Sequence, residues 1–216
     1  MRPRSSPDGS LERRPELIGV DLYQLGLLVV FAASLLGSPG PATVSLAASG
    51  AAIGRQRSLP FLGGIITGWF INLVAVVLGL AVLFTRFPEV EQAFKVASLV
   101  YIVYLAWKIA TSGAIGDGEG HHFRYVSGVL LNLLNPKAYI AATAIVTQFT
   151  VFGRDHASQV ATVVATSLLV ALVTQFGWIV AGDLLSHLFR DLRLARVLNG
   201  GMALLMVLTV LLATFA

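Results

Sequence analysis

The stretch VSGVLLNLLNPKAYIAATAIVTQF, residues 126–149, is apolar along most of its length but carries Asn135-Pro136-Lys137 near its middle. As a helix it is long enough to cross a bilayer core, which takes about 20 residues. A charge at the bilayer centre costs about 2.5 to 3.5 kcal/mol, and a proline frees a carbonyl that lipid cannot hydrogen-bond. Both costs fall if the segment lines a polar cavity, so we expect a functional site around Lys137. A structural lysine, at the interface or beside a buried acid, is the alternative.

The composition is that of an integral membrane protein. Of 216 residues, 56% are hydrophobic and 12% are charged, and the mean hydropathy is +0.80. Soluble domains carry about 25% charged residues. The apolar stretches continue without alternation, which predicts helices rather than membrane strands. The net charge of +4 comes from Lys and Arg beside these stretches, which indicates anchoring in a lipid bilayer and no nucleic-acid partner.

The chain contains no cysteine, which excludes disulfides, thiolate catalysis and Cys-ligated metals. His121-His122 lack a third ligand and do not predict a metal site. No nucleotide-binding or hydrolase motif occurs in a suitable context. We therefore expect no enzymatic activity, no cofactor and no metal.

Six membrane-spanning helices are expected after a disordered N-terminal tail, residues 1–21. A cleaved signal peptide with its core at Leu25–Leu36 is the alternative for the start of the chain. The expected spans are 22–53 with a break at 37–41, then 59–84, about 94–111, 126–149, 157 to about 185, and 195–215. Arg86, Pro88, Glu89 and Glu91 are expected to form the turn after the second span.

A single transmembrane domain, residues 22–216, divides at the hydrophilic loop 112–122 into repeat one, about 22–111, and repeat two, about 123–216. In each half only the first span is interrupted by proline near its middle, at Pro39 and Pro41 and at Pro136. Three spans per repeat is an odd number, so the second copy must enter from the opposite side. This predicts an all-α protein with two inverted three-helix repeats, as in secondary transporters, and a substrate site at the paired breaks.

The two breaks suit a zwitterionic substrate. Helix N-termini attract a carboxylate, and exposed carbonyls attract an ammonium group, which together match the ends of an amino acid. A packing kink is the alternative reading of either break. Asp183, near the end of the fifth span, is the first candidate for a proton-linked acid, with a plain interfacial position as the alternative. The candidate substrate-binding or transport residues are Pro39, Gly40, Pro41, Asn72, Asn135, Pro136 and Lys137.

The order Pro39-Gly40-Pro41, Gly54-Arg55-Gln56-Arg57, Tyr101–Trp107 and Asn135-Pro136-Lys137 resembles the LysE-type exporters, the lysine and threonine/homoserine efflux proteins of bacteria. The resemblance covers about Leu22 to the C-terminus. It implies export of amino acids or related small metabolites across the bacterial inner membrane, driven by the proton motive force through alternating access. Many members have asparagine where this chain has Ala42, and an acidic residue where it has Trp69-Phe70, which leaves the charge of the substrate and the proton coupling open.

Other functions stay open at this point: efflux of a metal cation or a toxic metabolite, or a non-transporting scaffold or intramembrane enzyme. Gly64 and Gly68 form a small-residue face that suits either a homodimer or internal packing. Lys and Arg are equally numerous on the two sides, and without the N-terminal tail their distribution favours both termini outside.

Overall fold

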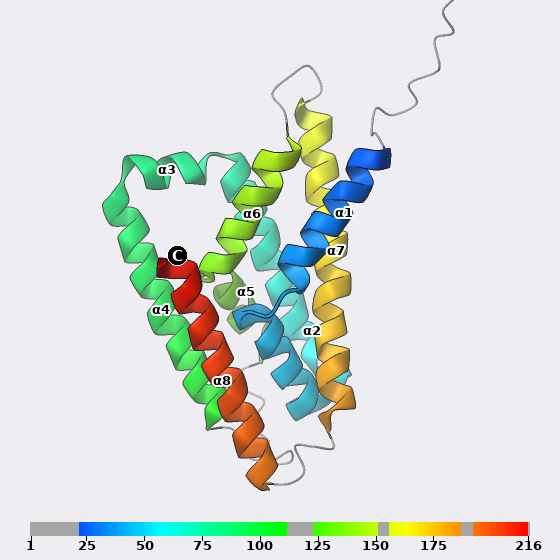
Figure 1. The fold of residues 1–216 in the computed structure, drawn as a ribbon, viewed down its shortest axis with the longest axis vertical. Helices are drawn as coiled ribbons and strands as arrows, with labels where there is room; N and C mark the ends of the chain where they lie inside the picture. Colours follow the sequence, from blue (N-terminus) through cyan, green and yellow to red (C-terminus); the bar gives the residue numbers. More distant parts are fainter. Residues whose placement is uncertain (1–21, 112–122, 151–155, 187–191, 216) are drawn as a thin grey trace, which may run out of the picture.

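A computed structural model describes residues 22–111, 123–150, 156–186 and 192–215 (Figure 1). Within these ranges the chain forms eight helices and no strand, which confirms the all-α prediction. The predicted tail 1–21, the loop 112–122 and His121-His122 lie outside the described residues. The helices are α1 Leu22–Gly37, α2 Pro41–Val77, α3 Leu80–Arg86, α4 Pro88–Ala110, α5 Tyr125–Leu133, α6 Pro136–Phe149, α7 His156–Leu184 and α8 Leu192–Phe215.

The first predicted break is confirmed, because α1 ends at Gly37 and α2 begins at Pro41. A second change of direction lies inside α2 at Gly54, whose φ of 77° belongs to the left-handed region that favours glycine. Gly40, before α2, contacts Lys137, while Asn72, near its other end, donates to Asn132 at 3.0 Å. A straight helix of 37 residues would be about 55 Å long and could not meet α5–α6 at both ends. The chain therefore folds back at Gly54.

The predicted second span 59–84 is wrong at its end. The α2 helix stops at Val77, and Gly79 follows with a φ of 97° before the short helix α3. The predicted turn around Pro88 is also wrong, because α4 begins there, with Glu89 and Glu91 in its first turn. Proline needs no donor at a first helical position, and acids there interact favourably with the helix dipole.

The second predicted break is confirmed at Leu134-Asn135. The helices α5 and α6 are bent by 66° across it, and Pro136 opens α6. In Figure 1 the two breaks lie at mid-height of the bundle, with α7 and the second half of α2 beside them.

Glycines hold helices in close contact at the end of the bundle that contains Gly54. A Cβ at Gly64 would collide with the Tyr125 carbonyl of α5, and a Cβ at Gly182 of α7 would collide with the Ala47 carbonyl. Gly68 is equally tight, because its Cβ would lie 2.7 Å from Cβ of Asn132. The Gly64 and Gly68 face is thus used for packing within the chain and is not available to a second copy.

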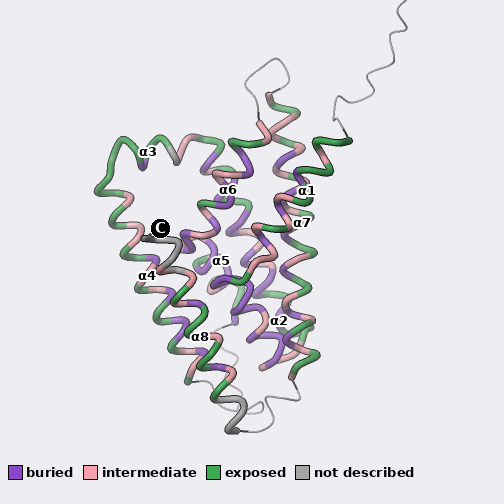
Figure 2. The backbone as a smooth tube through the Cα atoms, viewed as in Figure 1, coloured by how far each residue is buried: buried purple, intermediate pink, exposed green. Residues whose placement is uncertain are grey.

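The outer surface is that of a membrane protein. The helices α2, α4 and α7 are long and apolar enough to cross a bilayer, and the bent pair α5–α6 qualifies together. The α1 helix and the part of α8 at Val197–Thr209 are shorter apolar helices. Figure 2 shows exposed residues along the outer faces of the bundle. Large apolar side chains such as Val100, Leu169 and Val173 are more than half exposed. Such faces suit contact with lipid.

Candidate functional site

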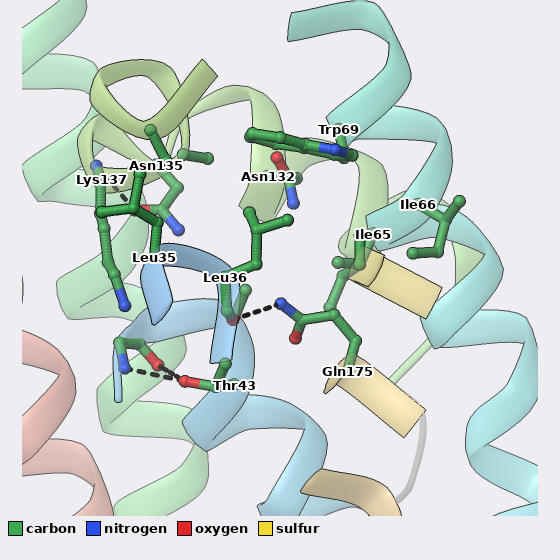
Figure 3. Close-up of a pocket in the computed structure, with 15 residues that line it drawn as sticks. Leu35, Leu36, Thr43, Ile65, Ile66, Trp69, Asn132, Asn135, Lys137 and Gln175 are labelled. Atoms are coloured by element: carbon green, nitrogen blue, oxygen red, sulfur yellow. Dashed lines mark hydrogen bonds between the residues drawn. The ribbon is translucent and has the colours of Figure 1, made fainter. Parts of the chain in front are cut away.

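A cavity lies between the two breaks, with walls from α1, α2, α5, α6 and α7 (Figure 3). Its volume of about 30 Å³ holds roughly two water molecules. It must therefore enlarge to hold an amino acid. The side chains that bring polar atoms to its lining are Thr43, Trp69, Asn132, Asn135, Lys137 and Gln175.

Lys137 joins the two breaks. Its Nζ donates to the carbonyl of Ser38 at 2.6 Å and to that of Pro39 at 2.9 Å. Gly40 leaves space for this side chain, since a Cβ there would lie 2.8 Å from Cδ of Lys137 and 2.9 Å from Nζ. The ammonium group from the start of α6 thus satisfies backbone carbonyls at the C-terminal end of α1, where the helix dipole favours a positive charge.

Two side chains of α7 satisfy the preceding carbonyls. Gln175 Nε2 donates to Leu36 at 3.1 Å, and Trp178 Nε1 donates to Gly37 at 3.0 Å. Gly37 stands four residues before Pro41, so its carbonyl is one that proline leaves without an intrahelical donor. Four successive carbonyls, those of residues 36 to 39, are therefore bound by α6 and α7.

Thr43 organises the start of α2. The Gly40 amide donates to Thr43 Oγ1 at 2.8 Å, and the Thr43 hydroxyl in turn donates to the Gly40 carbonyl at 3.0 Å. A side chain at the third helical position that accepts from the amide before the helix is the second half of a capping box. The first amide of the break is thereby bound locally.

The second break is organised by two asparagines. Asn135 precedes α6, and its Oδ1 accepts from the Lys137 amide at 3.1 Å. Asn132 stands four residues before Pro136, so its carbonyl lacks the usual intrahelical donor. Asn72 Nδ2 donates to that carbonyl at 3.0 Å and to Asn132 Oδ1 at 3.1 Å. Asn72 thus stabilises the break through these hydrogen bonds but does not itself line the cavity.

The predicted site residues are brought together around these breaks. Gly40, Asn135 and Lys137 line the cavity, and Pro39 contributes a carbonyl to Lys137. Pro41 and Pro136 are the first residues of α2 and α6.

Lys137 is the only charged residue in the cavity lining that the described part of the chain provides. Asp183 lies elsewhere, with its carboxylate 3.3 Å from Arg55 beside the Gly54 kink. Asp183 therefore does not line the cavity, and its role as a proton-linked acid stays a prediction. Among the described residues, no three or more His, Cys, Asp and Glu side chains lie close enough together to hold a metal.

Sequence reasoning missed five contributors: Thr43, Trp69, Asn132, Gln175 and Trp178. The sequence signal for Gln175 is an amide inside an apolar span, which suits helix-to-helix hydrogen bonding equally well. Trp69 and Trp178 give no polar signal in an apolar segment, and the polar contact of Trp178 depends on where α1 ends.

Comparison with known proteins gives a consistent result. A model of the LysE type translocator family matches residues 33–214. Cysteine/O-acetylserine efflux proteins of Escherichia coli (strain K12), Shigella sonnei (strain Ss046) and Shigella flexneri are each 31% identical to the chain over 177 residues. Each alignment covers 79% of this chain and 87% of the relative. No solved structure is significantly similar.

Proposed function

The chain belongs to the LysE type translocator family, and we propose that it is a secondary exporter of amino acids or closely related small metabolites. The family and the apolar helices place it in the bacterial inner membrane as a multi-pass protein, and they indicate a transporter rather than an enzyme. The named relatives, which are efflux proteins for cysteine and O-acetylserine, support amino acids as the substrate class.

One observation carries the proposal: the Lys137 ammonium binds the carbonyls of the opposite broken helix beside a cavity inside an apolar bundle. An intramembrane cation of this kind is expensive and marks a substrate or ion pathway. A substrate carboxylate would bind Lys137 and the N-terminal ends of α2 and α6, and a substrate ammonium would bind the α1 carbonyls.

We further propose a single transmembrane domain, residues 22–216, with six spans in two inverted repeats. The path of the chain supports this arrangement: α1 with the first half of α2, and α5 with α6, run in opposite directions in Figure 1. The bonding supports it as well. Trp178 of α7 caps the carbonyl that Pro41 frees, and Asn72 of α2 caps the carbonyl that Pro136 frees. Each broken helix is thus bound by the second span of the other repeat.

Transport is proposed to be driven by the proton motive force through alternating access, with Lys137 as the cation of the site. Both termini are proposed to lie outside. In support, the bend inside α2, the last turn of α4 and the start of α5 lie towards one end of the bundle, and they carry Arg55, Arg57, Lys108 and Arg124. The α3 helix and the first turns of α4, which carry Arg86 and Lys95, lie towards the other end. The more basic end is expected in the cytoplasm. A homodimer would need a face other than Gly64 and Gly68, which are buried in the chain.

Efflux from cells preloaded with a panel of amino acids and dipeptides tests the proposal, with and without an uncoupler. Lys137→Ala is expected to lower the flux at least about 100-fold, because it removes two charge-assisted hydrogen bonds at the site. Lys95→Ala is the matched control, since Lys95 pairs with Glu91 at 2.8 Å outside the cavity. Uncoupler-insensitive flux would overturn the coupling. Absence of flux for every amino acid and dipeptide in the panel would overturn amino-acid export.

A further inference from the structure

An ion pair joins α2 and α7 at the end of the bundle that contains Gly54. Arg55 Nε of α2 lies 3.3 Å from Asp183 Oδ2 of α7. Arg55 directly follows Gly54, where α2 changes direction, and a Cβ at Gly54 would lie 3.6 Å from the other carboxylate oxygen of Asp183. The pair therefore connects the kink in α2 to the last turn of α7.

The backbones of α2 and α7 are in direct contact beside this pair. A Cβ at Gly50 would collide with the Ile179 carbonyl, and a Cβ at Gly182 would collide with the Ala47 carbonyl. The contact is reciprocal, because each helix supplies one glycine and one carbonyl. Small residues of this kind let two membrane helices approach closely. No side chain fits between the helices here, so solute can pass only if they separate.

Apolar side chains fill the space between this contact and the cavity. Leu46, Phe61 and Ile179 are each 0% exposed and belong to one buried cluster. Each lies about one helical turn closer to the Gly54 end than a residue that lines the cavity, these being Thr43, Ile65 and Gln175. In this conformation a polar solute therefore has no open path from the Gly54 end to the cavity.

Building on the proposed function, we propose that the Arg55–Asp183 pair is the latch of a gate at the Gly54 end, which opens when α7 and the first half of α2 separate. An exporter takes its substrate from the cytoplasm, and the Gly54 end is the more basic one that we propose to lie there. The cavity has a volume of only about 30 Å³, so substrate entry requires an opening of this kind.

Gly54 is suited to be the hinge of this gate. The second half of α2 is held against α5, because a Cβ at Gly64 or at Gly128 would collide with a carbonyl of the opposite helix. The first half is held against α7 by the contact at Gly50 and Gly182. A glycine backbone changes its φ and ψ angles at little steric cost, so the two halves can move separately about Gly54.

Cross-linking across the gate tests the proposal, and the absence of cysteine from the chain makes the chemistry specific. The double variant Arg55→Cys/Asp183→Cys carries only two thiols, which a short bifunctional thiol reagent with a reducible linker can join. The purified variant in liposomes should transport amino acids before treatment. Transport should be lost on cross-linking, because the two helices can no longer separate, and should return when the linker is reduced.

The matched control is Glu91→Cys/Lys95→Cys. These residues also form an ion pair, with 2.8 Å between Lys95 Nζ and Glu91 Oε1, but they lie one turn apart on α4. The same reagent should join them without changing transport, because a link within one helix prevents no movement between helices.

A thiol in the cavity measures opening without transport. Ala42 lines the cavity and is 6% exposed, so Ala42→Cys should react slowly with a water-soluble maleimide. Because the Arg55 side chain is 62% exposed, Arg55→Ala or Asp183→Asn should raise the reaction rate only about two- to fivefold. The swapped pair Arg55→Asp/Asp183→Arg should restore the slow rate. A proton-linked role of Asp183 does not predict this rescue.

The outcomes are distinguishable. Unchanged transport by the cross-linked Arg55→Cys/Asp183→Cys protein would overturn the gate and leave amino-acid export standing. An unchanged labelling rate in both single-charge variants, or a raised rate that the swapped charges fail to restore, would overturn the latch. Failure of the wild-type protein to transport any amino acid would overturn the proposed function itself, and the labelling rate would still test the gate.

Discussion

The two broken helices differ in where their backbone groups find partners. At the α1–α2 break, the carbonyls of residues 36 to 39 are bound by side chains of α6 and α7. At the α5–α6 break, most partners are local: the amides of residues 137 to 139 bond to Asn135, and the Asn135 amide bonds to Asn132. Asn72 supplies the described bonds that reach this break from a distant segment.

The first break therefore depends on side chains of α6 and α7, whereas the second break is held mainly by its own local bonds. Movement of α6 or α7 would release carbonyls of the first break, whereas the second break would keep its local bonds. Released carbonyls need new partners, because lipid offers none. A substrate ammonium would be such a partner, so we infer that the first break is where binding and helix movement meet. The comparison predicts larger functional effects at the first break than at the second.

The largest effect in this comparison is expected for Gly40→Ala. The new Cβ would lie 2.8 Å from Cδ of Lys137, whose flexible side chain must move away from the Ser38 and Pro39 carbonyls. Because both charge-assisted bonds are weakened, amino-acid efflux should fall by about tenfold or more while the protein still folds. Efflux rate and thermal unfolding measure the two effects separately.

Gly26→Ala is the matched control for that change, because a Cβ at Gly26 of α1 meets no atom within 4 Å. It should leave efflux unchanged and raise the unfolding temperature slightly, because alanine favours a helix more than glycine does. Wild-type efflux by Gly40→Ala would contradict the view that the first break depends on the position of Lys137.

The second effect is one of stability. Asn72→Leu removes one of the two donors to the buried Asn132 carbonyl, the other being the Asn135 amide, and leaves Asn132 Oδ1 without its described donor. A buried polar group without a partner costs about 1–3 kcal/mol, so the unfolding temperature in detergent should fall clearly. Gln148→Leu is the control, because it changes an exposed amide on α6, which belongs to the α5–α6 broken span. An unchanged unfolding temperature for Asn72→Leu would mean that the local bonds alone hold this break.

The sequence predicts the positions of both breaks because proline acts locally. Pro41 and Pro136 lack the amide that a continuous helix needs, and this holds whatever the surroundings. The partners of the freed carbonyls are not predictable in the same way. Lys137 is 99 residues from Ser38 in sequence and Trp178 is 141 residues from Gly37, so their roles depend on the assembled bundle.

The errors of sequence reasoning have physical causes. Hydropathy continues through Leu80–Phe84, so it does not reveal that the backbone turns at Gly79. Gly64 and Gly68 do mark a helix-packing face, but small residues do not specify whether the partner is α5 or a second chain.

The smallest effect is expected for Asn135→Ala, because the second break keeps other local bonds. The change removes the side chain that caps the Lys137 amide, which typically costs about 1 kcal/mol. Asn135→Ser should restore most of that stability, since serine caps helices nearly as well. Equilibrium unfolding in detergent would measure both variants. If Asn135→Ala destabilised the protein more than Asn72→Leu, the local cap rather than the distant donor would hold the second break. If Asn135→Ser failed to restore stability, Asn135 would stabilise the protein through contacts with other cavity-lining residues and not through the cap.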